Sequence, residues 1–132
     1  MCSSDLKILG YDFSTVIHPS AVVTSDVILG EGSQGMSGEV IQPGSHIGCN
    51  TIINTRASVD HDCIIGDHVH ISPGVTLSGG VDIGAGSHIG TGATLIQGIS
   101  IGCGCLVAAG AVVVKDITDG EMVRGVPARG FV

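Results

Sequence analysis

The feature that most constrains this chain is a six-residue repeat that runs through most of its length. Every sixth position from Ile17 to Val113 is aliphatic, with the single exception of Gly35. The residue four places after each of these positions is mostly small or β-branched. An α-helix repeats its apolar positions about every 3.6 residues, and a strand with one buried face repeats them every second residue. Neither element produces a strict period of six.

A second period, three hexads long, is marked by glycines that each follow an inward Leu or Ile: Gly30, Gly48, Gly66, Gly84 and Gly102. The two periods together predict an all-β parallel β-helix with three hexads in each coil. Seventeen hexads make about 5.7 coils, stacked about 4.8 Å apart as a triangular prism. We expect the five glycines at the corners, where a positive φ suits a residue without a Cβ atom.

One hexad breaks the pattern. The segment GMSGEV, residues 35–40, has no inward aliphatic residue and places Glu39 at an inward position. We expect a local defect or a bulge there.

The pattern divides the chain into an N-terminal lead-in segment (1–16), the β-helix (17–118) and a C-terminal tail (119–132) that we expect to contact a cofactor. The first six residues, MCSSDL, fit no repeat. Because CSSDL is also what the end of a common sequencing adapter would encode, we hypothesise that the lead-in is partly artefactual. The native N-terminus would then lie upstream.

Composition excludes several classes of function. The net charge is −7, and the chain has only two Phe and one Tyr, which argues against a nucleic-acid partner. No apolar run approaches the roughly 18 residues that would predict a membrane-spanning helix. Five cysteines without a CxxC spacing indicate reduced thiols and a cytoplasmic location.

The segment NTRASVDHDC, residues 54–63, concentrates ionisable groups in an otherwise aliphatic and glycine-rich repeat. The 18-residue period places Gly79 one coil above His61 and Gly80 one coil above Asp62. A glycine pair above an imidazole and a carboxylate leaves room for a flat group against the backbone. Cys63 falls at an inward position, so we expect it to pack in the core.

From Ile17 to Arg129 the sequence resembles the sialic acid O-acetyltransferases and UDP-4-amino-sugar N-acetyltransferases among the left-handed β-helix, hexapeptide-repeat acyltransferases. The matching pieces are Asn54-Thr55, His61-Asp62-Cys63, His70-Ile71-Ser72 and GVPAR near the C-terminus. Full members of that subfamily carry a nucleotide-sugar-binding α/β domain ahead of the β-helix, which this sequence does not contain.

The resemblance implies an acetyl-CoA-dependent acetyltransferase that acts on a sugar hydroxyl or amine in surface glycan biosynthesis. It makes His61 the proton acceptor and Asp62 the group that raises its basicity. For the cofactor and the sugar, we expect two further sets of residues. The cofactor set is His70, Gly79, Thr91, Ala109, Arg124 and Arg129, and the sugar set is Asn54 and Arg56.

The stacking places His61 in one corner column and Thr91 with Ala109 in another. Two corners of one prism cannot face each other, so a site that uses both columns must lie between chains. A prism with three equivalent sides favours a homotrimer with three such sites.

Two other classes of function stay open. His70 and His88 are one coil apart and stack, with His68 nearby, so a carbonic-anhydrase-like metal site on the same fold is one alternative. We expect no metal, because those enzymes place two histidine ligands five residues apart and no such pair occurs here. We assign His18, His46 and His88 surface or packing roles. A non-catalytic trimeric scaffold is the other alternative.

Overall fold

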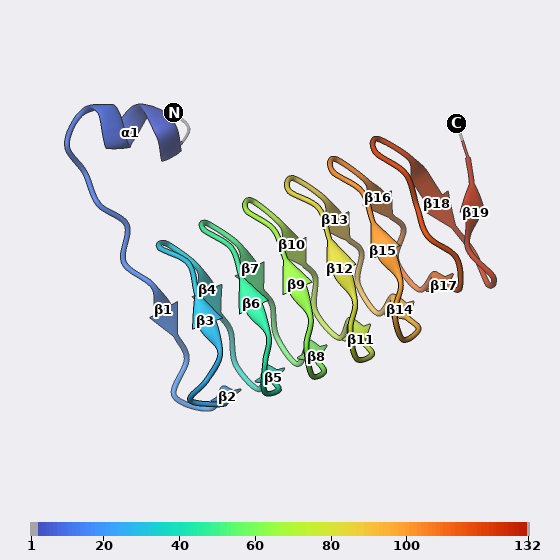
Figure 1. Cartoon of the computed structure of the whole chain (residues 1–132), viewed down its shortest axis with the longest axis horizontal. Helices are drawn as coiled ribbons and strands as arrows, with labels where there is room; N and C mark the ends of the chain where they lie inside the picture. Colours follow the sequence, from blue (N-terminus) through green and yellow to red (C-terminus); the bar gives the residue numbers. More distant parts are fainter. Residues whose placement is uncertain (1–2, 132) are drawn as a thin grey trace.

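The computed structural model describes residues 3–131, and almost all of them form one stack of triangular coils (Figure 1). A single helix, α1 (Ser3–Ile8), precedes the coils. The strands are β1 (Val16–Ile17), β2 (Val22–Val23), β3 (Ile28–Leu29), β4 (Gln34–Gly35), β5 (Val40–Ile41), β6 (His46–Ile47), β7 (Ile52–Ile53), β8 (Ser58–Val59), β9 (Ile64–Ile65), β10 (His70–Ile71), β11 (Thr76–Leu77), β12 (Asp82–Ile83), β13 (His88–Ile89), β14 (Thr94–Leu95), β15 (Ser100–Ile101), β16 (Leu106–Val107), β17 (Val112–Val113), β18 (Met122–Arg124) and β19 (Arg129–Gly130).

The strands form three sheets, one on each side of the prism. The eight-stranded sheet has the order β1-β4-β7-β10-β13-β16-β18-β19, the six-stranded sheet β17-β14-β11-β8-β5-β2, and the five-stranded sheet β15-β12-β9-β6-β3. Neighbouring strands within a sheet are mostly three elements apart in the chain, and paired residues such as His70 and His88 are separated by three hexads. The predicted parallel coil of three hexads is therefore confirmed.

We name the corners by the sheets that they join. Corner I joins the eight- and six-stranded sheets, corner II the six- and five-stranded sheets, and corner III the five- and eight-stranded sheets. In coil order, Thr55 lies at corner I, His61 at corner II and Asp67 at corner III.

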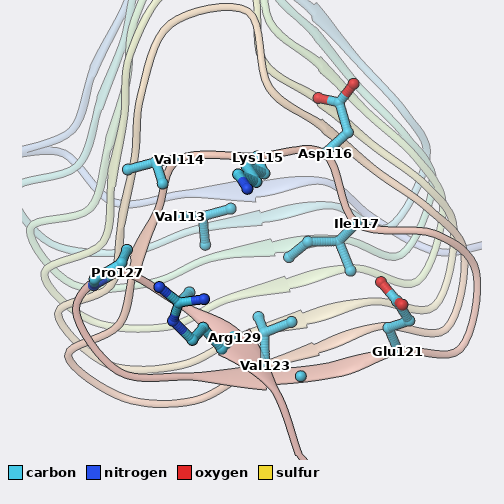
Figure 2. A pocket seen from close by; sticks show the side chains of 11 residues that line it. Val113, Val114, Lys115, Asp116, Ile117, Glu121, Val123, Pro127 and Arg129 are labelled. Atoms are coloured by element: carbon cyan, nitrogen blue, oxygen red, sulfur yellow. The ribbon is translucent and has the colours of Figure 1, made fainter.

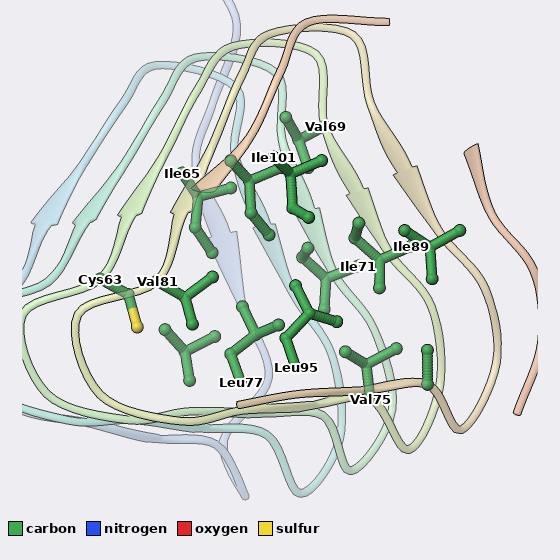
Figure 3. Close-up of a cluster of buried hydrophobic side chains, with 14 of the residues drawn as sticks. Cys63, Ile65, Val69, Ile71, Val75, Leu77, Val81, Ile89, Leu95 and Ile101 are labelled. Atoms are coloured by element: carbon green, nitrogen blue, oxygen red, sulfur yellow. The ribbon is translucent and has the colours of Figure 1, made fainter. Parts of the chain in front are cut away.

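The core is a column of aliphatic side chains inside the prism (Figure 3). The second residue of each two-residue strand points inward, so Ile65, Ile71 and Leu77 are almost completely buried. Each such side chain contributes about 1.5–3 kcal/mol of hydrophobic stabilisation. The small residue four positions later lies at the next corner, as Ala57 and Cys63 do, where the interior narrows.

The expected defect at Gly35 is absent. β4 pairs in register with β1 and β7, so no bulge interrupts the ladder. The Glu39 side chain is instead folded into the space that Gly35 leaves empty, because a Cβ atom on Gly35 would overlap the Glu39 carboxylate. Glu39 is fully buried, and neither carboxylate oxygen has a hydrogen-bond partner among residues 3–131. Burial raises the pKa of Glu39 to about 7.

The five glycines of corner III are there for a different reason from the one expected. None of them has a positive φ. A Cβ atom on Gly48 would lie 2.5 Å from the carbonyl carbon of Gly66 and 2.6 Å from the backbone nitrogen of Asp67. Close approach of successive coils therefore excludes a side chain from this column.

Positive φ occurs elsewhere in the corners, at the second turn residue of nearly every hexad. Glycine occupies most of these positions, but four successive ones carry side chains: Asn50, Arg56, Asp62 and His68. A left-handed conformation costs a residue with a Cβ atom about 1 kcal/mol or more. In the coil that contains the NTRASVDHDC segment, all three corners have a residue with a side chain in this conformation, namely Arg56, Asp62 and His68.

The last coil extends beyond Thr118, the expected end of the β-helix. β18 pairs in parallel with β16, but Leu106 is matched to Met122 rather than to Arg124, so this coil is shorter than the others. β19 then turns back antiparallel to β18 and closes the sheet edge. At the other end, α1 is attached to the first coil by an ion pair between Lys7 and Glu31.

Candidate active site at the corner between β8 and β9

His61 and Asp62 are the two turn residues of corner II between β8 and β9. The Nδ1 atom of His61 lies 3.0 Å from Oδ2 of Asp62. Both residues are exposed, and Asp62 has a φ of 58°. A carboxylate that accepts the Nδ1–H proton leaves Nε2 of a neutral imidazole as an unprotonated nitrogen. The pair therefore presents a base at the surface of the prism.

Two glycines from neighbouring coils make room for this pair. A Cβ atom on Gly79 would lie 2.5 Å from Cε1 and 2.6 Å from Nε2 of His61. A Cβ atom on Gly44, one coil before, would overlap the carboxylate of Asp62. The expected room above His61 is present, but Gly80 does not share in it, since nothing lies within 4 Å of a Cβ atom built there. Glycine suits position 80 for another reason, because the backbone there has a φ of 67°, which lies in the left-handed region.

Asp60 is closer to the pair than simple alternation along the strand suggests. Its Oδ1 atom accepts a hydrogen bond of 2.8 Å from the backbone N–H of His61. Asp60 thus supports the turn that carries the imidazole, while Asp62 contacts the ring itself.

Cys63 is the buried residue that follows, as expected. It is 0% exposed, and its Sγ atom lies 3.3 Å from the carbonyl oxygen of Ser78. Burial raises the pKa of the Cys63 thiol. A buried thiol with a raised pKa is a poor nucleophile, which fits a packing role.

A second polar group lies on the eight-stranded sheet at corner I. Nδ2 of Asn54 is 3.1 Å from Nε2 of His70. One coil further on, Oγ of Ser72 is 3.1 Å from Nε2 of His88. Burial lowers the pKa of His70, and the neighbouring His88 lowers it further. The sequence predicted the stacking of His70 and His88, but it did not reveal that each histidine bonds to a side chain of the preceding coil.

The other expected site residues at corner I are exposed turn residues. Thr91 and Ala109 are the first turn residues of successive coils, and each is followed by a glycine with a positive φ. Arg56 is exposed at the same corner with a φ of 56°. Its alkyl chain passes over Gly38, and it makes no ion pair with any residue that the structure describes. Within one chain, the corner I group and the corner II pair stay apart.

The two arginines near the C-terminus are directly opposite each other in the β18–β19 pair. The guanidinium carbon of Arg124 lies 4.9 Å from the ring centroid of Phe131. Arg129 instead lines a cavity of about 310 Å³ over the end of the core, with Lys115 on its rim (Figure 2). This cavity belongs to the final coil, three coils beyond the one that carries His61.

The described residues contain no group of three His, Cys, Asp or Glu side chains that could hold a metal ion. His68, the third member of the histidine cluster considered above, lies at corner III. Its Nδ1 atom is 2.9 Å from Nδ2 of Asn50, so its partner lies away from His70 and His88. Between residues 3 and 131, no helix combines the length and the apolar character needed to cross a membrane.

The sequence matches a known repeat pattern and a known acetyltransferase. The pattern "Bacterial transferase hexapeptide (six repeats)" matches residues 44–79. The GDP-perosamine N-acetyltransferase of Escherichia coli O157:H7 is 36% identical over 81 residues, which are 61% of this chain and 37% of that protein.

Solved structures match over nearly the whole chain. The acetyltransferase domain of PglB from Neisseria gonorrhoeae FA1090, in complex with acetyl coenzyme A, is 45% identical with a TM-score of 0.95. The alignment covers 98% of this chain and 63% of that one. PerB from Caulobacter crescentus, in complex with CoA and GDP-perosamine, is 43% identical with a TM-score of 0.96, over 98% and 62% of the two chains. This chain thus spans less than two thirds of these relatives.

The comparisons confirm the left-handed parallel β-helix that the resemblance implied. They also agree with the hexapeptide pattern read from the sequence. The chain is therefore a hexapeptide-repeat β-helix, homologous to GDP-perosamine N-acetyltransferase and to the acetyltransferase domain of PglB.

Proposed function

We propose that this chain is the acetyl-transferring part of an enzyme that acetylates the amino group of a nucleotide-linked sugar in glycan biosynthesis, with acetyl-CoA as co-substrate. The observation that carries the proposal is the His61–Asp62 pair, an exposed imidazole whose Nδ1 is engaged by a carboxylate 3.0 Å away. Homologues that were solved with acetyl coenzyme A, or with CoA and GDP-perosamine, support the choice of both substrates.

In this mechanism His61 acts as the general base. Its Nε2 atom takes a proton from the sugar amine as the nitrogen attacks the thioester carbonyl carbon. Asp62 holds the proton on Nδ1 and stabilises the imidazolium that forms. The new C–N bond replaces the C–S bond, and the departing thiolate receives the proton from His61. No covalent intermediate on the protein is needed, in keeping with a buried Cys63.

We propose that the active unit is a trimer with each site between two chains. His61 lies at corner II, whereas His70, Thr91 and Ala109 lie on the eight-stranded sheet and corner I. One triangular prism cannot bring these groups to one point. A neighbouring prism that presents corner I to corner II would do so, and three equal contacts close a ring.

Cofactor binding is assigned to His70, Gly79, Thr91 and Ala109 along the prism. Arg124 and Arg129 serve as cationic partners for the CoA phosphates. On an acidic chain, two arginines opposite each other on β18 and β19 are a local concentration of positive charge. Arg56, exposed at corner I without an ion-pair partner among the described residues, fits a contact with an anionic group of the sugar nucleotide. Asn54 was expected beside the sugar as well.

An amine is favoured over a hydroxyl as the acceptor, because the matched relatives are named as N-acetyltransferases or were solved with GDP-perosamine. A sialic acid hydroxyl is the second candidate, and the resemblance of the NTRASVDHDC segment to sialic acid O-acetyltransferases supports it. We place the protein in the cytoplasm. The four described cysteines, which are all free thiols, support this location.

The test is the release of CoA thiol from acetyl-CoA in the presence of nucleotide-linked amino sugars and, separately, of sialic acids. His61→Ala should lower kcat/KM at least a hundredfold, since a general base contributes about 10²–10⁴ in rate. Asp62→Asn should lose less, and Asp60→Asn least, because an amide oxygen can still accept the His61 backbone N–H.

The folded state of each variant is checked by its melting temperature, which should change little for these exposed residues. Wild-type rates for His61→Ala would refute the assignment. A failure to bind acetyl-CoA would favour the scaffold. Stoichiometric zinc that is required for activity would favour the metalloenzyme.

A further inference from the structure

The outer face of the eight-stranded sheet carries two histidines in direct contact. β10 and β13 are neighbouring strands (Figure 1), and their first residues, His70 and His88, are paired in register. Their ring centroids are 4.8 Å apart with an interplanar angle of 67°. On the other side of β10, β7 presents Ile52 opposite His70, so His88 is the titratable group that faces His70 across the sheet.

The amide of Asn54 is held in one orientation. Its Oδ1 atom accepts a hydrogen bond of 2.8 Å from the backbone N–H of Thr55. This leaves Nδ2 as the atom that faces Nε2 of His70 at 3.1 Å. An amide nitrogen only donates, so Nε2 of His70 must accept. A neutral His70 therefore carries its proton on Nδ1.

The surroundings of His70 disfavour a second proton. Burial lowers its pKa, and the adjacent His88 lowers it further. A proton on Nε2 would also direct an N–H toward the amino group of Asn54. The His88 ring is itself held in place, because its Nε2 atom bonds to the hydroxyl of Ser72, which is 4% exposed.

His61 and His70 are thus alike in tautomer but opposite in chemistry. In His61 the Nδ1–H group is engaged by Asp62, and Nε2 is the nitrogen without a hydrogen bond among the described residues. In His70 it is Nε2 that is engaged, by Asn54, and the Nδ1–H group has no hydrogen bond to any described residue. The first ring offers an acceptor, and the second offers a donor.

We propose that Asn54 and His88 are positioning residues: Asn54 fixes His70 as its Nδ1–H tautomer, and His88 holds the ring in place by packing against it, so that His70 presents a hydrogen-bond donor to acetyl-CoA. This inference rests on the proposed function for the identity of the ligand. It removes Asn54 from the expected sugar-binding set, since both ends of its amide are already engaged within the chain. An unprotonated nitrogen beside the thioester would compete with His61 for the amine proton, and the Nδ1–H form does not.

The tautomer can be read without substrate from the imidazole ¹⁵N chemical shifts of the histidine-labelled chain. The chain has only six histidines, and single substitutions assign them. We expect His70 to show a protonated Nδ1 and an unprotonated Nε2 at pH 7.5. Asn54→Asp retains an acceptor for the Thr55 N–H but replaces the donor that faces His70. It should therefore move the His70 proton to Nε2 and raise the pKa of His70.

His88→Phe keeps an aromatic ring against His70 without an ionisable nitrogen. It should retain the Nδ1–H tautomer and raise the pKa of His70. His46→Ala is the matched control, because His46 is also the first residue of a strand but belongs to the five-stranded sheet. It should leave the shifts and pKa of His70 unchanged.

A His70 proton on Nε2 in the wild type, or no change in Asn54→Asp, would overturn the proposal. In acetyl transfer, Asn54→Asp and His70→Ala should each lower kcat/KM about tenfold or more, and the double variant should be no worse than His70→Ala alone. Additive losses would show that Asn54 does not act through His70. If the tautomer is as expected but no sugar is acetylated, the proposed function fails and the assignment of the tautomer stands.

Discussion

Replacing Glu39 by Gln should remove a loss of stability that wild type suffers as the pH rises from about 4.5 to about 7. Glu39 occupies the interior space left by Gly35 and is fully buried, and neither of its carboxylate oxygens has a hydrogen-bond partner in the part of the chain that the structure describes. Such a site admits the neutral acid but opposes the carboxylate, which explains a pKa raised from 4.5 to about 7. Gln has the same length and is neutral at every pH.

The sign follows from proton linkage. The folded state binds the Glu39 proton more tightly than the unfolded chain, so the stabilisation is complete below about pH 4.5 and decreases as the pH rises to about 7. Raising the pKa from 4.5 to about 7 corresponds to a loss of about 3 kcal/mol of stability, since each pH unit is worth about 1.36 kcal/mol. Above pH 7 the loss is constant. The carboxylates Asp26 and Glu31 have lowered pKa values and act in the opposite direction, but they are common to both proteins.

The assay is urea unfolding of wild type and Glu39→Gln between pH 4 and 8.5, at one protein concentration. The difference in unfolding free energy should move in favour of Gln by about 3 kcal/mol across this range, with most of the change between pH 4.5 and 7. Asp82→Asn, at an exposed outward position of β12, is the matched control for a change from carboxylate to amide. The double variant Gly35→Ile/Glu39→Ala copies the neighbouring Ile53–Ala57 pair and should behave as Gln does. A difference that is flat with pH would refute the argument that a neutral Glu39 fills the core.

Two further predictions concern the coils and the tail. Gly48→Ala should destabilise the fold by about 1–3 kcal/mol in urea unfolding, because the new methyl group would lie 2.5 Å from the backbone of the next coil. Gly130→Ala, whose Cβ atom would meet only an ordinary contact at 3.9 Å, is the control, and equal losses in both would contradict the close-approach argument. Arg124→Ala/Arg129→Ala should weaken acetyl-CoA binding in calorimetry, more strongly at low ionic strength, where charges are least screened. Unchanged affinity at low salt would show that these arginines are merely solvated.

Much of the fold could be predicted because every coil repeats the same pattern of inward and corner positions. The inward aliphatic residues, the three-hexad stacking and the corner columns all follow from spacing alone. Gly35 and Glu39 were misjudged because each was read separately. A missing side chain and an inward acid four residues later compensate each other within one coil, and only the three-dimensional packing shows that the second fills the space of the first.

The glycines show the limit of reading conformation from residue type. Glycines such as Gly48 and Gly80 look alike in the sequence. Glycine is required at position 48 because the next coil lies too close for a side chain, whereas at position 80 it is favoured by a positive φ. Strand β18 was not predicted, because it rejoins the sheet with a shortened step after the hexad period has ended.

At the candidate site, the sequence predicted which residues share a corner, and Gly79 was correctly placed against His61. It did not predict the hydrogen bond between Asp60 and the His61 backbone. It also did not predict that His61 is bonded through Nδ1 and His70 through Nε2. Those features depend on side-chain torsions, which a repeat pattern does not encode. The identical sequence separation of Asn54–His70 and Ser72–His88 was the available signal.

In the proposed trimer, a working site combines His61 of one chain with His70 of another. The most direct measurement mixes His61→Ala and His70→Ala chains in equal amounts, exchanges their subunits, and follows acetyl transfer from acetyl-CoA. If sites lie between chains, about a quarter of them regain both histidines, and activity should rise well above that of either parent, toward about a quarter of the wild-type value. If each chain carries a complete site of its own, mixing restores nothing beyond the average of the two parents, and the account is contradicted.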